Sequence, residues 1–189
     1  METNKEQYWK TETRKARHKD LQEDFTPPEV VDLLLDGQDG LFSEYTNGEV
    51  CTDFTKTFLD PCIGIGFIYI GVLKKRLEHC KTSDDILDAI KTMYGTELMQ
   101  DNVDECKLNI ISCIRGFIAE NELVPEDKKT FIFWEKSLVP EDTRAFQPKS
   151  RFYNEVQKIL DHNIVCTDTF KWDYENWCPI KEEKVMPLF

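Results

Sequence analysis

Residues 58–66, Phe-Leu-Asp-Pro-Cys-Ile-Gly-Ile-Gly, are the part of this chain whose residue types and spacing best suit ligand binding. An apolar run ends at Asp60 and is followed by a proline and then by Gly64 and Gly66. Glycine has no Cβ, so the backbone can bend tightly there and approach a ligand closely. A helical pattern begins at Phe67, and the first turn of a helix offers unpaired N–H groups to a polar ligand. The pattern predicts a strand, a ligand-binding turn and a helix, although an ordinary structural turn would use the same residues.

The spacing of these glycines does not fit the dinucleotide fingerprint G-x-G-x-x-G. That motif needs a third glycine at position 69, where this chain has Tyr69. A lone G-x-G is a weak signal, so the interpretation of the turn depends on its neighbours in the sequence.

Three further segments stand in a fixed order around the turn. Residues 24–34 read Asp-Phe-Thr-Pro-Pro-Glu-Val-Val-Asp-Leu-Leu, residues 94–97 read Tyr-Gly-Thr-Glu, and residues 164–169 read Ile-Val-Cys-Thr-Asp-Thr. Over residues 20–110 and 160–175 the chain resembles the S-adenosylmethionine-binding part of adenine-N6 DNA methyltransferases of the gamma class, which include the modification subunits of restriction systems. In that family a Phe-Thr-Pro segment precedes an Asp-Pro-x-x-Gly-x-Gly loop. A Gly-x-Glu strand end and an Asp-[Ala/Thr]-[Leu/Phe] strand end then follow.

The resemblance implies an α/β fold of the class I methyltransferase (Rossmann-like) kind, which is a parallel sheet with flanking helices. It also implies S-adenosylmethionine as the cofactor. The chain ends where a fourth strand and its motif are expected, so we expect a fold truncated at the C-terminus. The alternation of strands and helices independently favours a parallel sheet, in which ligands bind at the carboxyl ends of the strands. Asp60, Glu97 and Asp168 each fall at such an end.

The methionine end of the cofactor is assigned by resemblance to the glycine turn. The residues expected to line it are Asp60, the backbone at Cys62, Gly64 and Gly66, and the segment Phe25, Thr26 and Pro27. A carboxylate at position 60 would complement the positive sulfonium and amino groups. Asp60 could equally cap the following helix, and residues 25–27 could be a plain helix start.

The adenosine end is assigned by resemblance to the other two strand ends. Glu97 would accept both ribose hydroxyls, and Leu98 or Met99 would lie against the adenine. Asp168 would accept a hydrogen bond from the adenine amino group, with Thr169 and Phe170 alongside it. As alternatives, Glu97 could be an ordinary exposed carboxylate and Asp168 a turn residue.

The catalytic signature of the family, [Asn/Asp/Ser]-Pro-Pro-[Tyr/Phe/Trp], is degenerate in this chain. In the family its polar side chain accepts a hydrogen bond from the target adenine, and its ring stacks on the flipped base. The expected place is occupied by Met186, Pro187, Leu188 and Phe189. A thioether is a very weak acceptor, so the catalytic residues are unknown. Methyl transfer requires the methyl donor and the acceptor to be aligned along one line. Because the degenerate motif lacks the group that would orient the acceptor, we expect that the chain is catalytically impaired alone or is one part of a split enzyme.

The charge balance argues against tight DNA binding and raises an alternative function. The formal net charge is −12, whereas proteins that bind DNA collect phosphates with lysine and arginine. Residues 14–19 form the one basic stretch, which is typical of a solvated helix face or of a phosphate contact. The alternative is a non-catalytic acidic interaction protein, either a DNA mimic or an inhibitor of a nucleic-acid-binding protein. As a methyltransferase-like domain, the chain would have DNA or a complementary enzyme subunit as its partner. As an acidic interaction protein, it would bind a nucleic-acid-binding protein.

With 189 residues, 40% of them hydrophobic, the chain is long enough for one domain with a sizeable core. We expect a charged segment over residues 1–22 and a methyltransferase-like domain over 23–189, with an insertion near 119–150. The predicted strands are 56–60, 92–97 and 163–167, and the predicted helices are 26–35, 67–77, 83–90, 101–114 and 153–160. Ser83-Asp84-Asp85 and Asp101 are the expected caps of two of these helices.

The seven cysteines show no C-x-x-C spacing, so zinc binding is not expected. Cys62, Cys106, Cys113 and Cys166 stand in apolar stretches and are expected to be reduced core residues, which indicates a cytoplasmic protein. The sequence contains neither a secretory signal nor a run long enough to span a membrane. Trp172, Tyr174 and Trp177 form an aromatic cluster, which could be a core or interface plug or a platform for stacking bases.

Overall fold

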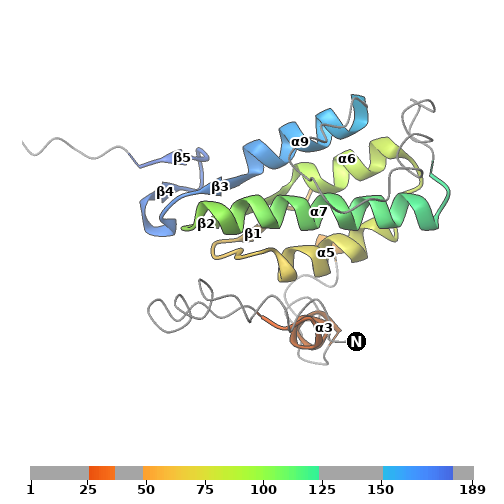
Figure 1. The fold of residues 1–189 in the computed structure, drawn as a ribbon, viewed down its shortest axis with the longest axis horizontal. Helices are drawn as coiled ribbons and strands as arrows, with labels where there is room; N and C mark the ends of the chain where they lie inside the picture. Colours follow the sequence, from red (N-terminus) through yellow and green to blue (C-terminus); the bar gives the residue numbers. More distant parts are fainter. Residues whose placement is uncertain (1–25, 37–48, 124–150, 181–189) are drawn as a thin grey trace, which may run out of the picture.

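The computed structural model describes residues 26–36, 49–123 and 151–180. The strands are β1 (Phe58–Asp60), β2 (Met93–Glu97), β3 (Ile164–Cys166), β4 (Trp172–Asp173) and β5 (Cys178–Pro179). The helices are α3 (Pro28–Asp36), α4 (Glu49–Thr52), α5 (Phe67–Leu77), α6 (Ser83–Lys91), α7 (Gln100–Glu120) and α9 (Arg151–Asn163), with a 3-10 turn η1 (Thr169–Lys171). Figure 1 shows their arrangement, with the β4–β5 hairpin beyond the end of β3.

The first three strands form one parallel sheet in the order β1-β2-β3. Phe58 is paired with Met93, and Gly95 is paired with Ile164. Phe58, Met93 and Ile164 are buried together with the apolar faces of the helices. The mixed α/β architecture with a parallel sheet and flanking helices is therefore confirmed.

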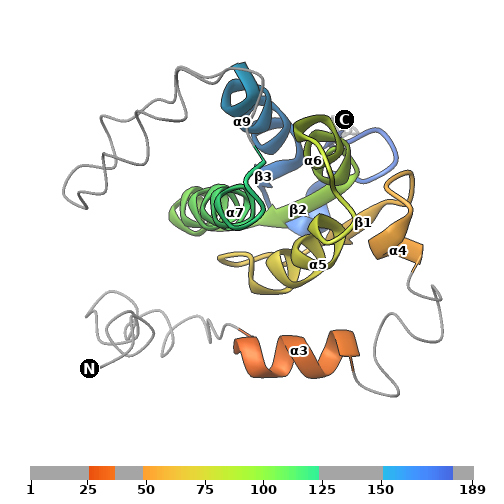
Figure 2. The same cartoon turned by 90° about the vertical axis from the view of Figure 1, so that its right-hand side faces the viewer.

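The helices cover both faces of the sheet, as parallel strands require. In Figure 2, α6 and α9 lie on one side of the strands, α5 lies on the other, and α3 packs outside α5. Helix α7 packs against α5, β2 and β3 and buries a stripe with the spacing of an amphipathic helix. That stripe consists of Val103, Cys106, Ile110, Ile114 and Ile118.

The starts of two helices differ from their expected caps. Thr82, one residue before the expected segment, is the N-cap of α6, and it forms a capping box with Asp85. The Asp85 carboxylate accepts hydrogen bonds from the N–H groups of Lys81 and Thr82, which holds its pKa below the usual value. The expectation for Asp101 was wrong, because Met99 is the N-cap of α7 and provides no side-chain hydrogen bond. Asp101 lies instead in the first turn, where its charge suits the helix dipole.

Helix α3 approaches α5 closely because α5 has a glycine at the contact. A Cβ added at Gly71 would lie 2.6 Å from Val31 Cγ1 and 2.7 Å from Leu35 Cδ1. Val31 and Leu35 are buried, whereas the other α3 residues whose burial is described are exposed. The attachment of α3 therefore depends on the missing side chain at position 71.

Arg76 joins four parts of the chain at the amino end of the sheet. Its buried guanidinium donates hydrogen bonds to the carbonyl oxygens of Val50, Lys56 and Ala89 at 2.6–2.7 Å and to Thr92 Oγ1 at 2.8 Å. These acceptors belong to α4, the approach to β1, the end of α6 and the residue before β2. Burial lowers the pKa of Arg76 from its usual value, and the hydrogen bonds of the cation compensate for part of that desolvation.

The outer edge of β1 is unpaired in the described part of the chain. Phe58 N–H donates to Thr92 O at 2.9 Å and so faces β2. Because the backbone direction alternates along a strand, the N–H and C=O groups of Leu59 face away from β2. Neither group has a hydrogen bond within the described residues, and the Leu59 side chain is 38% exposed.

Several sequence predictions fall outside the described residues. They concern the segment 1–22 with its basic stretch, the segment 124–150, and the degenerate motif at Met186, Pro187 and Phe189. Within the described part, residues 119–120 complete α7. Of the helices that the structure describes, none combines the length and the apolar character needed to cross a bilayer.

Candidate functional site

The carboxyl edge of the sheet brings together three of the acidic residues singled out in the sequence. Asp60 is the last residue of β1, and Glu97 is the last residue of β2. Glu97 is paired with Cys166, the last residue of β3, and Asp168 follows two residues later. The Thr167 N–H donates to Glu97 O at 2.8 Å, which ties the start of the Asp168 turn to the end of β2. The fold therefore places Asp60, Glu97 and Asp168 at the same edge of the sheet, as expected from the sequence.

The loop between β1 and α5 has the glycine-dependent backbone expected from the sequence. Gly64 has φ 54° and Gly66 has φ 90°, both in the left-handed region that side chains rarely adopt. A Cβ at Gly66 would also lie 2.7 Å from Cys106 Sγ, so the loop sits directly on α7. Gly66 is the N-cap of α5 and provides no side chain to cap the helix. The first turn of α5 therefore receives no hydrogen bond from a capping side chain.

Glu97 holds this loop against the end of β2. Its Oε2 accepts a hydrogen bond from Gly64 N–H at 3.0 Å, and its Oε1 accepts one from Met99 N–H at 2.9 Å. Ile63 N–H also donates to Thr96 O at 3.0 Å. Glu97 is thus a structural bridge and not the free loop carboxylate of the alternative interpretation. Each carboxylate oxygen accepts more than one hydrogen bond, so the bridge leaves capacity for ligand hydroxyls.

Asp60 accepts fewer hydrogen bonds than Glu97, and burial disfavours its charged form. Burial raises the pKa of the Asp60 carboxyl, the hydrogen bond from Cys62 N–H opposes this effect, and the negative charge of Glu97 adds to it. The bond from Cys62 N–H reaches Oδ1 at 3.2 Å, and Oδ2 has no hydrogen-bond partner within the described residues. Oδ2 is not sealed from solvent either. A cationic donor placed beside it would relieve both the desolvation and the repulsion from Glu97.

Asp168 is a turn residue, which was the alternative interpretation of its position in the sequence. Its Oδ1 accepts a hydrogen bond from Phe170 N–H at 3.0 Å, so it caps the 3-10 turn η1. Its Oδ2 lies 3.9 Å from Lys171 Nζ. The turn places Phe170 outward with 89% of its surface exposed. Leu98, which follows Glu97, is 65% exposed, so large apolar side chains stand beyond two adjacent strand ends.

Thr26 and Pro27 lie just before α3, the helix that packs on the outside of α5. Pro27 O accepts hydrogen bonds from Val30 N–H and Val31 N–H at 2.9 and 3.0 Å, which starts the helix. Within the described residues no hydrogen bond or ion pair joins Thr26 or Pro27 to the strand ends. Phe25, the third member of the predicted group, lies outside the described residues.

Two of the cysteine expectations were wrong. Cys62 and Cys166 are exposed, because they stand in the loop after β1 and at the end of β3, where the apolar stretches leave the core. Cys106 is buried beneath Gly66, and Cys113 is half-buried. None of the seven cysteines forms a disulfide bond. Burial raises the pKa of the Cys106 thiol and so disfavours a thiolate under the loop.

The aromatic cluster is a plug on the sheet. Trp177 packs edge-on against Tyr94 of β2 with ring centroids 4.7 Å apart, and it packs against Trp172 at 5.4 Å. Its indole N–H donates to His162 O at 2.7 Å. The cluster therefore fixes the β4–β5 hairpin to β2 and to the end of α9.

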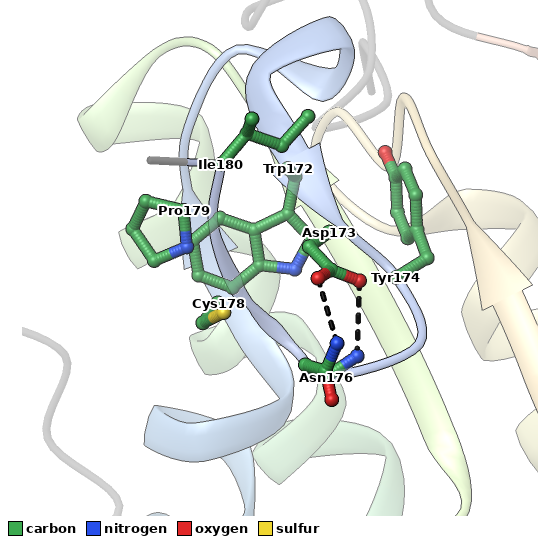
Figure 3. Close-up of a pocket in the computed structure, with 7 residues that line it drawn as sticks. All are labelled: Trp172, Asp173, Tyr174, Asn176, Cys178, Pro179 and Ile180. Carbon is green, nitrogen blue, oxygen red and sulfur yellow. Dashed lines mark hydrogen bonds between the residues drawn. The ribbon is translucent and has the colours of Figure 1, made fainter. Parts of the chain in front are cut away.

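A hollow of about 690 Å³ opens on the hairpin (Figure 3). The Asp173 carboxylate, which lines it, is already engaged within the hairpin. It accepts hydrogen bonds from the N–H groups of Glu175 and Asn176 and from Asn176 Nδ2, and these bonds lower the pKa of Asp173. Asp173 is therefore a turn residue and not a free acceptor.

Sequence reasoning missed the residue that joins the hairpin to the candidate site. The Tyr174 hydroxyl is hydrogen-bonded to Thr169 Oγ1, and it donates to Thr169 O at 3.1 Å. It also lies 3.3 Å from Oγ1 of the fully buried Thr96. Tyr174 and Thr96 are 78 residues apart, and no local pattern signals such a contact.

Comparisons of the chain with models of protein families, with curated proteins and with solved structures find no match.

Proposed function

We propose that the carboxyl edge of the sheet binds S-adenosylmethionine and that the chain is a class I methyltransferase-like domain of the adenine-N6 DNA methyltransferase lineage. The observation that carries the proposal is that the Gly64–Gly66 loop closely follows Asp60, whose carboxylate accepts only one hydrogen bond within the described residues. The uncapped start of α5 offers N–H groups beside a carboxylate that lacks a counter-ion. A ligand with both a carboxylate and a cationic centre matches this pair, and the methionine end of the cofactor has both.

The adenosine end of the ligand would lie along β2 and β3. Glu97 keeps lone pairs for ribose hydroxyls while it holds Gly64. Leu98 and Phe170 offer exposed apolar surface to a planar base. Asp168 Oδ2, which lies 3.9 Å from Lys171 Nζ, would accept a hydrogen bond from the amino group of adenine, because the hydrogen bond to the turn is made by Oδ1.

The location of the site is tested by substitution of the two carboxylates. Asp60→Ala and Glu97→Ala should each weaken S-adenosylmethionine binding by roughly 1 to 3 kcal/mol, since each leaves a polar ligand group unpaired. The matched control is Asp88→Asn, which alters an exposed carboxylate of α6 paired with Lys91, away from the strand ends. Equal affinities for Asp60→Ala and the wild-type chain by calorimetry would place the site elsewhere.

Among the described residues the outer edge of β1 has no partner strand, and this favours the split-enzyme form of the proposal. In open α/β sheets a ligand binds at the point where the strand order reverses. Here the described order β1-β2-β3 runs in one direction only, so the described residues contain no reversal beside Asp60. A strand from a second polypeptide placed beside Leu59 would pair its N–H and C=O groups and create such a reversal. Methyl transfer would then require both chains.

The net charge of −12 favours the second candidate function, a non-catalytic acidic interaction protein. Such a protein would occupy the nucleic-acid-binding surface of a partner by presenting carboxylates in place of phosphates. The two candidates differ in their ligand. The first binds S-adenosylmethionine, and the second binds a basic protein surface and has no need of a nucleotide.

A further inference from the structure

Three hydroxyl groups meet at the junction between the glycine loop, the end of β2 and the Asp168 turn. Thr96 Oγ1 donates a hydrogen bond to Pro61 O at 2.7 Å, at the beginning of the loop. It lies 3.3 Å from Thr169 Oγ1 and 3.3 Å from the Tyr174 hydroxyl. Thr169 and Tyr174 are hydrogen-bonded to each other. One connected group of side chains therefore touches both halves of the candidate site.

The number of protons in this group gives Tyr174 a distinct role. A hydroxyl donates one proton, and Thr96 donates its proton to Pro61 O over the shortest of its contacts. Four contacts remain among Thr96, Thr169 and Tyr174, and the hydroxyls of Tyr174 and Thr169 supply only two protons for them, so Tyr174 is one of just two donors. Removing the tyrosine hydroxyl would therefore leave Thr96 and Thr169 connected only through their own 3.3 Å contact.

The Tyr174 ring is held from behind, so its hydroxyl has a defined position. The ring packs against Trp177 with centroids 6.2 Å apart, and Trp177 packs in turn on Tyr94 of β2. The indole N–H of Trp177 is anchored on His162 O at 2.7 Å. The β4–β5 hairpin therefore places the Tyr174 hydroxyl at the strand ends, while the Tyr174 ring packs against Trp177.

We infer that Tyr174 is a positioning residue of the proposed S-adenosylmethionine site. It fixes the Asp168–Phe170 turn relative to the glycine loop, so that the two ends of one ligand are bound together. The inference rests on the proposed function and adds a part of the chain that the family resemblance does not assign to the site. It requires that losing the hydroxyl weakens a ligand that spans both halves more than one that occupies a single half.

The test is calorimetric titration of the full chain and its Tyr174→Phe variant with two probes, S-adenosylmethionine and adenosine. S-adenosylmethionine spans both halves, whereas adenosine reaches only the β2 and β3 ends. We expect Tyr174→Phe to weaken S-adenosylmethionine about three- to tenfold, as for the loss of one hydrogen bond. Adenosine affinity should change less than twofold, and the melting temperature should stay close to that of the wild type.

Tyr94→Phe is the matched control. It removes a hydroxyl from the same aromatic cluster, and this hydroxyl has no hydrogen bond within the described residues. If Tyr174→Phe fails to fold, Thr169→Val removes the other hydroxyl of the pair, with Thr169→Ser as the variant expected to restore binding.

Different outcomes separate the inference from the proposed function. If the wild type binds S-adenosylmethionine and Tyr174→Phe binds both probes as Tyr94→Phe does, the positioning role is overturned and the site stands. Equal loss for both probes together with a lower melting temperature would show a merely structural role. If the wild type does not bind S-adenosylmethionine, the proposed function and the inference fail together.

Discussion

Asp60 differs from the other acidic side chains at the strand ends because its charge is the least compensated. Glu97 accepts two backbone hydrogen bonds, and Asp168 caps a turn. Asp60 accepts one at 3.2 Å and is desolvated, so its pKa is raised. Such perturbation beside an uncapped helix start is typical of a binding site, and it makes the proposal testable by pH.

We expect the affinity for S-adenosylmethionine to rise with pH through the range just above the ordinary pKa of an aspartate. Asp60 is protonated at the low end of that range and becomes ionised at the high end, where it attracts the cationic ligand. The stability of the free protein should move in the opposite direction. A carboxyl with a raised pKa binds its proton more tightly in the folded state, so stability is lost as pH rises through the folded pKa.

Asp60→Asn should remove the contribution of Asp60 to both pH dependences, because the amide does not titrate, whereas the contribution of carboxyls with lowered pKa values such as Asp85 and Asp173 remains. Calorimetry across this pH range measures the first dependence, and urea unfolding measures the second. S-adenosylhomocysteine, which lacks the sulfonium charge, provides the control ligand and should show a weaker pH dependence. An unchanged pH profile in Asp60→Asn would assign the titration to another group.

At the scale of elements, the contact between α3 and α5 depends on one missing side chain. A helix normally gains up to about 1 kcal/mol when an interior glycine becomes alanine. At Gly71 the new methyl group would lie 2.6 Å from Val31 Cγ1 and 2.7 Å from Leu35 Cδ1, so these side chains or α3 as a whole must shift. At Gly116 of α7 the same methyl group would enter open space.

We therefore expect Gly71→Ala to be less stable than Gly116→Ala by roughly 1 to 3 kcal/mol, the usual effect of overpacking. Urea unfolding of both variants gives this difference directly. Gly116→Ala should equal or exceed the wild type. Equal stability of the two variants would mean that α3 is not held against Gly71.

The sequence allowed prediction of the elements that carry local signals. Apolar periodicity predicts the strand before the glycine turn and the amphipathic helix α7, and the structure contains both. The same patterns place Asp60 and Glu97 at strand ends, where the structure has them. Arg76 could not be predicted in this way, because after Lys74 and Lys75 it resembles the usual basic last turn of a helix. Its acceptors come from four separate segments.

The β4–β5 hairpin was missed for a similar reason. Its strands have two residues each and carry no period-2 pattern of useful length. Its position is set by Trp177 on Tyr94 and by Tyr174 at the strand ends, and both are long-range contacts. The exposure of Cys62 and Cys166 was missed because apolar neighbours in sequence do not show where a strand leaves the core.

For the whole molecule, the charge predicts weak binding to duplex DNA. A net charge of −12 repels phosphates at long range, and counter-ion release can offer little to a chain with few clustered cations. We expect gel-shift titration at low salt to show at most weak binding, which disappears as salt rises. Submicromolar binding that survives physiological salt would contradict this and would implicate residues 14–19.

The chain alone should not methylate adenine. The motif that would hold the target base reads Met-Pro-Leu-Phe, and the loss of such a positioning group typically lowers rates by orders of magnitude. Transfer of labelled methyl groups to unmethylated DNA tests this. Met186→Asn alone should restore little activity. Labelling that appears only when a second polypeptide is added would support the split-enzyme form, whereas robust labelling by the purified chain would contradict the prediction.

The most direct test of the central claim is titration of the wild-type chain with S-adenosylmethionine in an isothermal calorimeter. The account predicts binding with a stoichiometry of one and an accompanying rise in melting temperature, since a ligand that binds only the folded state stabilises it. The absence of both binding heat and a thermal shift at millimolar cofactor would contradict the claim, and the acidic interaction protein would then be the better description of this chain.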